Sequence, residues 1–258
     1  MERNRAKRKL ERGELTLMAG NFENADLIDF VGSLGLVDAV WIDMEHSPVT
    51  WRELADMSRA ADLWGMSSIV RVRDNDPAII SLTLGEGVDG IIIPHVNTRE
   101  EAEAAVRAAK FEPIGYRGTS GGRKSYGHKD HYARANSETL LAIMIEDKVA
   151  VDNLPEILKV PHINAFYVSH HDLAQSIGLL NAPHDPGIHE LFDRGIKQIV
   201  DAGKIAGATI GEQESEKYLS MGVKLVKAPA WRSYVASGMA AFVRKLGGQA
   251  DQAPTAGA

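Results

Sequence analysis

Residues 39–48 read A-V-W-I-D-M-E-H-S-P and carry the pattern that decides the fold. Alternate positions of a β-strand point to opposite faces of its sheet, and one face of this strand is wholly aliphatic. The other face carries the carboxylates of Asp43 and Glu45, with His46 just beyond them. A strand of a parallel sheet is usually apolar on both faces, and buried acids are costly unless they are paired. We therefore interpret this stretch as a buried strand whose end contributes to a site.

Seven other short apolar runs occur along the chain, and each is followed by a segment with helical signals. Together with the stretch above, the expected strands cover residues 15–20, 68–73, 90–94, 141–146, 165–168, 205–210 and 224–228. The expected helices cover residues 25–34, 50–64, 98–110, 154–158, 185–203, 212–221 and 234–246, and a further one begins at Asp76-Pro77. Two of them open with a capping box, formed by Thr50 with Glu53 and by Thr98 with Glu101.

Eight strands, each followed by a helix, favour an α/β fold that closes into a single (β/α)₈ TIM barrel. No linker is long enough to separate domains, so the barrel is expected to span residues 1–246. Residues 247–258 are rich in glycine, alanine, glutamine and proline, and a disordered tail is expected there. An open, doubly wound sheet is the alternative, but no G-x-G-x-x-G motif follows the first strand.

The composition is typical of a globular protein, with 44% hydrophobic and 25% charged residues among 258. A formal net charge of −6 argues against nucleic acid or an anionic membrane as a partner, and the absence of cysteine excludes disulfides and thiolate metal sites. No apolar run is long enough for a membrane span, and the basic start at residues 1–9 lacks the apolar core of a secretory signal. A cytoplasmic location is therefore expected. We interpret the basic start as a solvated helix, with an anion-binding arm as the alternative.

The working groups of such barrels lie at the carboxyl ends of the strands. The polar residues there are Asp43, Glu45 and His46 after the second strand, Arg71 and Arg73 after the third, Glu146 and Asp147 after the fifth, and Ser169, His170, His171 and Asp172 after the sixth. Random placement would scatter acids, histidines and arginines over the molecule. Their gathering on one rim indicates a site.

Glu146 and Asp172 follow adjacent strands, so both carboxylates are expected to reach one point above the barrel mouth. Two carboxylates, completed by water and substrate oxygens, suit Mg²⁺ or Mn²⁺ better than zinc. The structural alternative is that Asp172 caps the helix starting at Leu173 and that Glu146 pairs with Lys148.

Arg71 is expected to point inward and to neutralise Asp43 and Glu45, with one edge of its guanidinium free to stabilise an oxyanion. His46 is either a contact between a helix and a loop or an acid–base group. Asp43 favours the second interpretation, because a carboxylate fixes the tautomer of an imidazole and raises its basicity.

The stretch Gly115–Lys124 is glycine-rich and basic, but it lacks the spacing of a P-loop. It follows a helix and precedes a strand, which places it on the bottom of its own barrel. It could cradle a phosphate, serve a neighbouring subunit's site or an interface, or form a flexible surface loop.

These residues resemble those of a known family. The run Trp41 to Pro48, Arg71 followed by Asn75-Asp76, the segments Pro94-His95-Val96 and Gly115-Tyr116-Arg117-Gly118, and Glu146 are similar to the HpcH/HpaI aldolase family, over residues 10–246. The resemblance implies a class II, divalent-metal-dependent aldolase acting on pyruvate and an aldehyde. It also implies a pyruvate-type TIM barrel, assembled as a hexamer (a trimer of dimers) whose last helix is exchanged between subunits.

The resemblance also implies roles for individual residues. Glu146 and Asp172 would hold Mg²⁺, Mn²⁺ or Co²⁺, which chelates the 2-oxo acid. Arg71 would bind the keto oxygen and stabilise the enolate. His46, oriented by Asp43, would act through water as base and acid. Glu45 would lie against the substrate.

The chain departs from the family in the turn after the sixth strand. Ser169-His170-His171-Asp172 stands where the family usually has Gly-Pro-x-Asp, whose backbone amides hold the pyruvate carboxylate. The replacement places two imidazoles beside the metal, as possible ligands or acid–base groups. Phe22 stands where a tryptophan is common and is expected to line the same pocket.

The function expected from the rim and the resemblance is cleavage of a 4-hydroxy-2-oxo acid into pyruvate, or a related 2-oxo acid, and an aldehyde. The first alternative is a thioester lyase of the citryl- or malyl-coenzyme A type. The second is a catalytically silent barrel that binds metal and keto acid, which the altered turn would favour. The expected partners are these small molecules and further copies of the chain.

Overall fold

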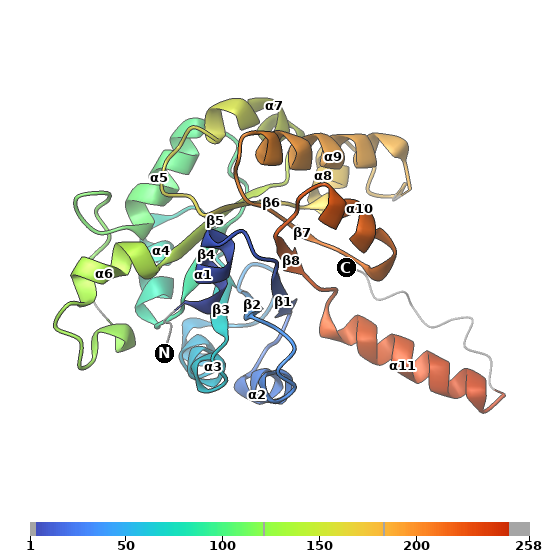
Figure 1. Ribbon diagram of the computed structural model, residues 1–258, viewed down its shortest axis with the longest axis horizontal. Coiled ribbons are helices and arrows are strands. Elements are labelled where there is room, and N and C mark those ends of the chain that lie inside the picture. Colours follow the sequence, from blue (N-terminus) through green and yellow to red (C-terminus); the bar gives the residue numbers. More distant parts are fainter. Residues whose placement is uncertain (1–3, 121, 183, 248–258) are drawn as a thin grey trace.

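The computed structural model describes residues 4–120, 122–182 and 184–247, and it contains a closed barrel of eight parallel strands in chain order (Figure 1). The strands are β1 (Thr16–Gly20), β2 (Ala39–Asp43), β3 (Ser67–Arg71), β4 (Gly90–Ile93), β5 (Leu140–Ile145), β6 (Ala165–Val168), β7 (Ala206–Thr209) and β8 (Leu225–Lys227). Because β8 pairs with β1, the predicted barrel is confirmed and the open doubly wound sheet is wrong. The predicted tail lies outside the described residues from position 248 onward.

Helices surround the barrel and also lie at its ends (Figure 1). They are α1 (Arg5–Glu11), α2 (Ala25–Ser33), α3 (Trp51–Leu63), α4 (Pro77–Gly85), α5 (Arg99–Ala109), α6 (His131–Glu138), α7 (Lys148–Ile157), α8 (His170–Ser176), α9 (Pro186–Asp201), α10 (Ser215–Ser220) and α11 (Trp231–Lys245). Both capping boxes are present. α7 begins six residues before the predicted start, because the helix continues on the N-terminal side of Pro155 and buries Ala150 and Val151. Within the described part of the chain, no helix is both long and apolar enough to cross a bilayer.

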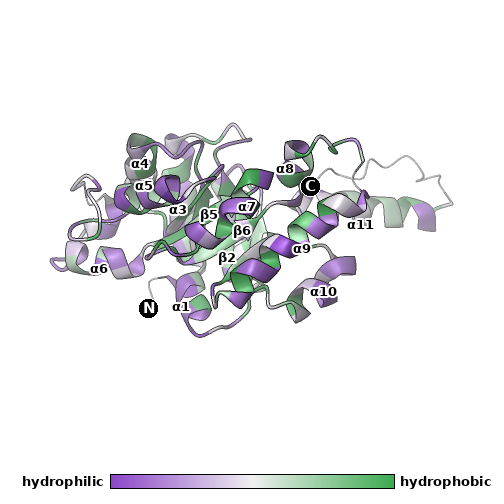
Figure 2. Ribbon diagram, turned by 90° about the horizontal axis from the view of Figure 1, so that it is seen from above, coloured by the Kyte–Doolittle hydropathy of each residue, from purple (hydrophilic) through white to green (hydrophobic). Residues whose placement is uncertain are grey.

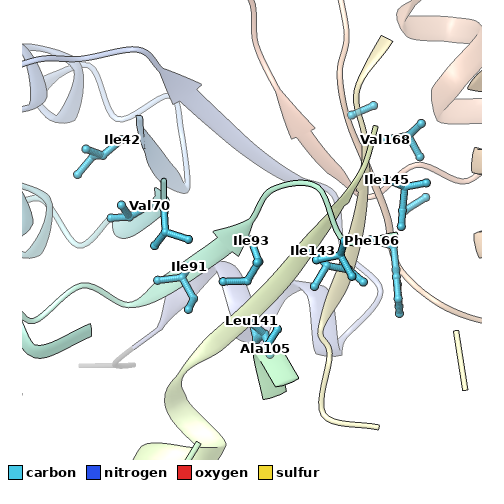
Figure 3. Close-up of a cluster of buried hydrophobic side chains, with 14 of the residues drawn as sticks. Ile42, Val70, Ile91, Ile93, Ala105, Leu141, Ile143, Ile145, Phe166 and Val168 are labelled. Atoms are coloured by element: carbon cyan, nitrogen blue, oxygen red, sulfur yellow. The ribbon is translucent and has the colours of Figure 1, made fainter. Parts of the chain in front are cut away.

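The alternation of the strands divides the core into two parts. Side chains on one strand face fill the barrel, including Trp41, Met144 and Tyr167. Side chains on the other face pack under the surrounding helices, and the strands at the centre of Figure 2 are coloured as largely hydrophobic. Figure 3 shows this outer layer, where Ile42, Val70, Ile91, Ile143 and their neighbours meet. Asp43 lies two residues after Trp41 and therefore on the face directed into the barrel.

The basic amino-terminal segment forms α1, which closes the amino-terminal end of the barrel. Ala6 and Leu10 belong to the cluster inside the barrel, so one face of α1 is buried and the expectation of a solvated helix is wrong. Arg5 and Lys9 form ion pairs with Asp38 at 2.9 and 2.7 Å. These basic side chains are matched by acids of the same chain, which argues against an anion-binding arm.

The glycine-rich loop after α5 lies at the amino-terminal end of the strands, as its place in the sequence predicts. Arg123 and Lys124 pair with Asp62, and Lys124 also pairs with Asp89, which directly precedes β4. Because the two cations are neutralised by this chain, the loop does not present them as a phosphate cradle.

Replacing Ile143 by alanine is expected to lower the free energy of unfolding by about 2–5 kcal/mol, because a fully buried strand side chain would leave a cavity in the outer core. Urea denaturation monitored by circular dichroism measures the change. Leu36→Ala is the matched control, since Leu36 is 71% exposed and should change little. Equal stabilities of the two variants would contradict the packing described here.

Candidate active site

The carboxyl ends of β2 and β3 are joined by a buried ion pair. Asp43 and Arg71 are register partners, so their side chains leave the two strands side by side. Arg71 Nε donates to Asp43 Oδ1 at 3.0 Å and Nη2 donates to Oδ2. The third nitrogen, Nη1, lies 2.9 Å from Oε2 of Glu45. One guanidinium thus bridges two carboxylates at the barrel mouth, as the sequence predicts.

The two partners shift each other's pKa in opposite directions. Burial alone would raise the pKa of Asp43, but the hydrogen bonds and the charge of Arg71 outweigh it and lower the pKa. Burial would lower the pKa of Arg71, but Asp43, and then Glu45 and Glu146, raise it. Both groups therefore remain charged, and the site has a fixed positive group held in a low-dielectric environment.

The ring of His46 lies beside Glu45 rather than Asp43. Its Nε2 is 3.6 Å from Oε2 of Glu45, and the side chain is 63% exposed. Asp43 Oδ1 instead accepts the backbone N–H groups of Glu45 and His46, at 3.0 and 3.3 Å. Asp43 therefore fixes the turn that carries His46, which differs from the expected contact between carboxylate and imidazole.

Glu146 is buried directly after β5, with 1% exposure, and its Oε1 accepts the backbone N–H of His95 at 2.6 Å. Burial, and then the charge of Asp172, raise the pKa of Glu146 to about 7. That these two carboxylates approach one point above the barrel mouth stays a prediction. The alternative partner is wrong, because Lys148 Nζ pairs with Asp152.

His95 lies among three carboxylates. Its Nδ1 is 3.2 Å from Asp147 Oδ2 and 3.5 Å from Glu146 Oε1, and its Nε2 is 3.7 Å from Glu45 Oε1. Its backbone has φ +50°, a conformation that is rare outside glycine and is often retained at functional sites. Burial would lower the pKa of His95, but the carboxylates outweigh it and raise the pKa. Sequence reasoning assigned no role to His95, and its positive φ could not be predicted from Pro94-His95-Val96.

In the turn after β6, Asp172 does not cap the helix and His170 does not lie beside the expected metal position. Ser169 is the N-cap of α8, and its Oγ donates to Asp172 Oδ2 at 2.6 Å, so Asp172 lies inside the first turn rather than at its cap. His171 is exposed. His170 packs instead against α9, with its ring centroid 4.9 Å from that of His189 and 5.6 Å from that of Phe192.

Phe22 is placed differently from what the sequence suggested, and Lys227 is a residue of the barrel mouth to which the sequence assigned no role. Phe22 is only 1% exposed and belongs to the core under the helices, so it offers almost no surface to a pocket. Lys227 ends β8, is 8% exposed, and holds its Nζ 5.6 Å from the centroid of the Trp41 ring. The sequence could have indicated that Lys227 points into the barrel, because it lies two residues after Leu225 and side chains two apart on a strand share a face.

The donor set fits a hard divalent cation. Glu146 and Asp172 offer carboxylate oxygens. A cation beside them would offset the cost of burying the charge of Glu146 and the repulsion from Asp172, the two effects that raise the pKa of Glu146. Across residues 4–120, 122–182 and 184–247, no group of three or more His, Asp or Glu side chains has the arrangement of a metal site. A site with two protein ligands leaves the remaining positions to water and substrate.

Residues 20–228 match the family model described as HpcH/HpaI aldolase/citrate lyase. The chain is 30% identical over 218 residues to a 4-hydroxy-2-oxo-heptane-1,7-dioate aldolase of Shigella sonnei, covering 83% of each protein. It is 29% identical to a 2-keto-3-deoxy-L-rhamnonate aldolase of Klebsiella pneumoniae, covering 85% of this chain and 84% of that protein. A crystal structure of a HpcH/HpaI aldolase/citrate lyase family protein from Burkholderia cenocepacia has the same fold, with a TM-score of 0.87 at 24% identity over 93% of this chain and 98% of the other.

Replacing Arg71 by methionine is expected to lower the free energy of unfolding by about 3 kcal/mol, because Asp43 would remain buried without its counter-charge. The loss should shrink as the pH is lowered, because protonation neutralises the stranded carboxylates. Chemical denaturation at several pH values measures it. Adding Asp43→Asn to the Arg71→Met protein should recover part of the lost stability. An Arg71→Met protein as stable as the wild-type protein would contradict the buried ion pair of Arg71 with Asp43.

Proposed function

Because this chain belongs to the HpcH/HpaI aldolase/citrate lyase family, we propose that it is a divalent-metal-dependent aldolase. It cleaves a 4-hydroxy-2-oxo acid reversibly into pyruvate, or a related 2-oxo acid, and an aldehyde. The observation that supports the proposal is a chain of contacts at the barrel mouth that links Arg71 to Glu146. Glu45 lies 2.9 Å from Arg71 Nη1 and 3.7 Å from His95 Nε2, and His95 Nδ1 lies 3.5 Å from Glu146 Oε1. The two relatives described above are both named as aldolases of 2-oxo acids.

Each step of the reaction has a group of this chain to perform it. Glu146 and Asp172 would hold Mg²⁺, Mn²⁺ or Co²⁺, which supplies a Lewis acid that polarises the keto group. Arg71 stabilises the negative charge that develops on the keto oxygen, as its fixed position and permanent charge allow. Backbone amides of His170 to Asp172, in the first turn of α8, would bind the carboxylate, since the N–H of Ser169 already donates to the carbonyl of Ile145.

Proton transfer is assigned to His46. Its ring is exposed at the rim and lies next to Glu45, which is itself held by Arg71. In the cleavage direction, His46 therefore takes the proton from the hydroxyl of the 4-hydroxy-2-oxo acid as the carbon–carbon bond breaks, and it returns that proton to the enolate carbon to form the methyl group of pyruvate, directly or through water. His95 and Asp43 act as positioning residues: His95 orients Glu146 through its backbone N–H, and Asp43 orients Arg71.

Two other functions remain as rivals to the aldolase. A citrate-type thioester lyase is included in the family's description, and acceptance of a coenzyme A substrate would identify it. A catalytically silent barrel that binds metal and keto acid is favoured by the altered turn, in which His170 packs against α9. It would bind pyruvate without cleaving any 4-hydroxy-2-oxo acid.

We also propose that the chain is a homo-oligomer, a hexamer built as a trimer of dimers, in which α11 packs on a neighbouring subunit. Figure 1 shows α11 extending away from the barrel, and none of its residues is buried within the described structure. Val235, Met239, Phe242 and Leu246 are all more than half exposed and lie at helical spacing along one face. Such an apolar stripe is typical of a surface that another chain covers.

Release of pyruvate from a 4-hydroxy-2-oxo acid should stop when a chelator is added and return with Mg²⁺, Mn²⁺ or Co²⁺. Glu146→Gln should remove the activity at every metal concentration, because it deletes one ligand oxygen and its charge. A coupled lactate dehydrogenase assay measures pyruvate. Glu156→Gln is the matched control, since Glu156 is an exposed acid on α7. Full activity of Glu146→Gln in the presence of chelator would refute the metal role.

Replacing Phe242 by aspartate should dissociate the oligomer, because a charge would enter the apolar stripe of α11. Light scattering after size-exclusion chromatography measures the mass of the assembly. Ser237→Asp places the same charge on the opposite side of α11 and should leave the mass unchanged. A wild-type protein that is monomeric at micromolar concentration would overturn the proposed assembly.

A further inference from the structure

A cavity of about 60 Å³ lies at the amino-terminal end of the barrel, the end opposite to the candidate active site. Its walls include Asp89, which directly precedes β4, and Thr139, which directly precedes β5. Side chains of α4, α6 and the glycine-rich loop complete it. Figure 1 shows α6 at the edge of the molecule, on the side away from α11. The volume is sufficient for several water molecules or one compact ion.

Arg117 is a buried cation in the wall of this cavity. It is 7% exposed, and its Cζ lies 4.7 Å from the centroid of the Phe111 ring. Within the described part of the chain, its guanidinium has no hydrogen-bond acceptor and no carboxylate within ion-pair distance, and its Nε is buried without a partner. Burial lowers the pKa of Arg117 to about 10, which leaves the group charged at pH 7. A buried charge is costly unless an anion accompanies it.

The remaining acids and cations that line the cavity are paired within the described structure. Lys124 Nζ lies 3.1 Å from Asp89 Oδ1. Glu138 Oε1 lies 2.6 Å from Arg8 Nη2 and 3.9 Å from Arg134 Nη2. These pairs leave one guanidinium of the cavity without a counter-charge.

Backbone contacts hold the segment that carries this guanidinium. The N–H of Arg117 donates to the carbonyl of Lys110 at 2.9 Å, and the N–H of Tyr116 donates to that of Arg107 at 2.8 Å. A Cβ atom at Gly115 would lie 2.3 Å from the carbonyl oxygen of Arg107, so only glycine lets the loop lie this close to the end of α5. The planar guanidinium is therefore held in place for a two-pronged contact with an oxyanion.

We propose that this cavity is a second ligand site, in which Arg117 binds a compact oxyanion such as phosphate or a small carboxylate. The anion joins the glycine-rich loop to α6, because the cavity is lined from both segments. It stabilises the folded protein by mass action and takes no part in the reaction at the barrel mouth. This site is distinct from a cradle formed by Arg123 and Lys124, whose charges are matched by acids of this chain.

Isothermal calorimetry on the full-length protein at pH 7, in a buffer whose only other anion is chloride, tests the site with two probes, inorganic phosphate and acetate. At least one probe should bind wild-type protein with a Kd of about 1 mM or below. Arg117→Met keeps the aliphatic stem over Phe111 and should weaken that binding by roughly tenfold to a hundredfold, because charge-assisted hydrogen bonds are lost. The probe whose binding responds to this change identifies the ligand as a phosphate or a carboxylate.

Arg107→Met is the matched control, since the side chain of Arg107 is 49% exposed on α5 and its loss should leave binding unchanged. Hydrogen exchange locates the anion, because α6 and residues 115–120 should exchange more slowly with the bound probe in wild-type protein but not in Arg117→Met. Should the methionine variant fold poorly, Arg117→Lys keeps the charge without the planar fork and should weaken binding by roughly tenfold.

Wild-type protein that binds neither probe overturns the proposal, as it would if a carboxylate of a second copy of this chain fills the cavity. Binding that is equally strong in Arg117→Met also overturns it. Slower exchange confined to the carboxyl ends of the strands has the same consequence, because the anion would then lie at the barrel mouth. These measurements need no turnover, so their outcome is separate from that of the aldolase.

Discussion

The site depends on one constraint: two carboxylates and a guanidinium are buried together where β2 and β3 end. In-register pairing of Asp43 with Arg71 brings the charges together before any substrate arrives. The cost of removing them from water is offset by a two-pronged interaction and by two backbone N–H groups donated to Asp43. The same contacts hold the turn that carries Glu45 and His46. The ion pair therefore positions both the guanidinium of Arg71 and the imidazole of His46 at the rim.

The closed barrel holds this buried ion pair in place. Closure of β8 on β1 leaves no free strand edge, and two layers of apolar side chains hold the strands in register. A rigid scaffold keeps polar groups from different strands within reach of each other although they are far apart in sequence. Arg71 ends β3, Glu146 directly follows β5 and Lys227 ends β8, so the barrel mouth gathers charged groups that are far apart in the sequence.

The sequence predicted those features that follow from periodicity. Strand alternation correctly placed Asp43 and Arg71 inside the barrel, and the capping boxes correctly placed the starts of α3 and α5. Features that depend on how a chain turns after a strand could not be predicted. His95 enters the site through a positive φ, and His170 turns toward α9 because aromatic neighbours are available there. Lys227 passes so close to Gly20 that a side chain at position 20 would collide with it, and no local pattern reveals this contact between residues more than two hundred positions apart.

In the proposed reaction, an anion formed on a keto acid is stabilised between Arg71 and a cation that Glu146 and Asp172 would hold. Exchange of the methyl protons of pyruvate into deuterated water, followed by proton NMR without any aldehyde present, isolates that step. Exchange is expected for the wild-type protein with a divalent metal, and its loss is expected for Arg71→Met. Exchange that continues at the wild-type rate in a correctly folded Arg71→Met protein would contradict it.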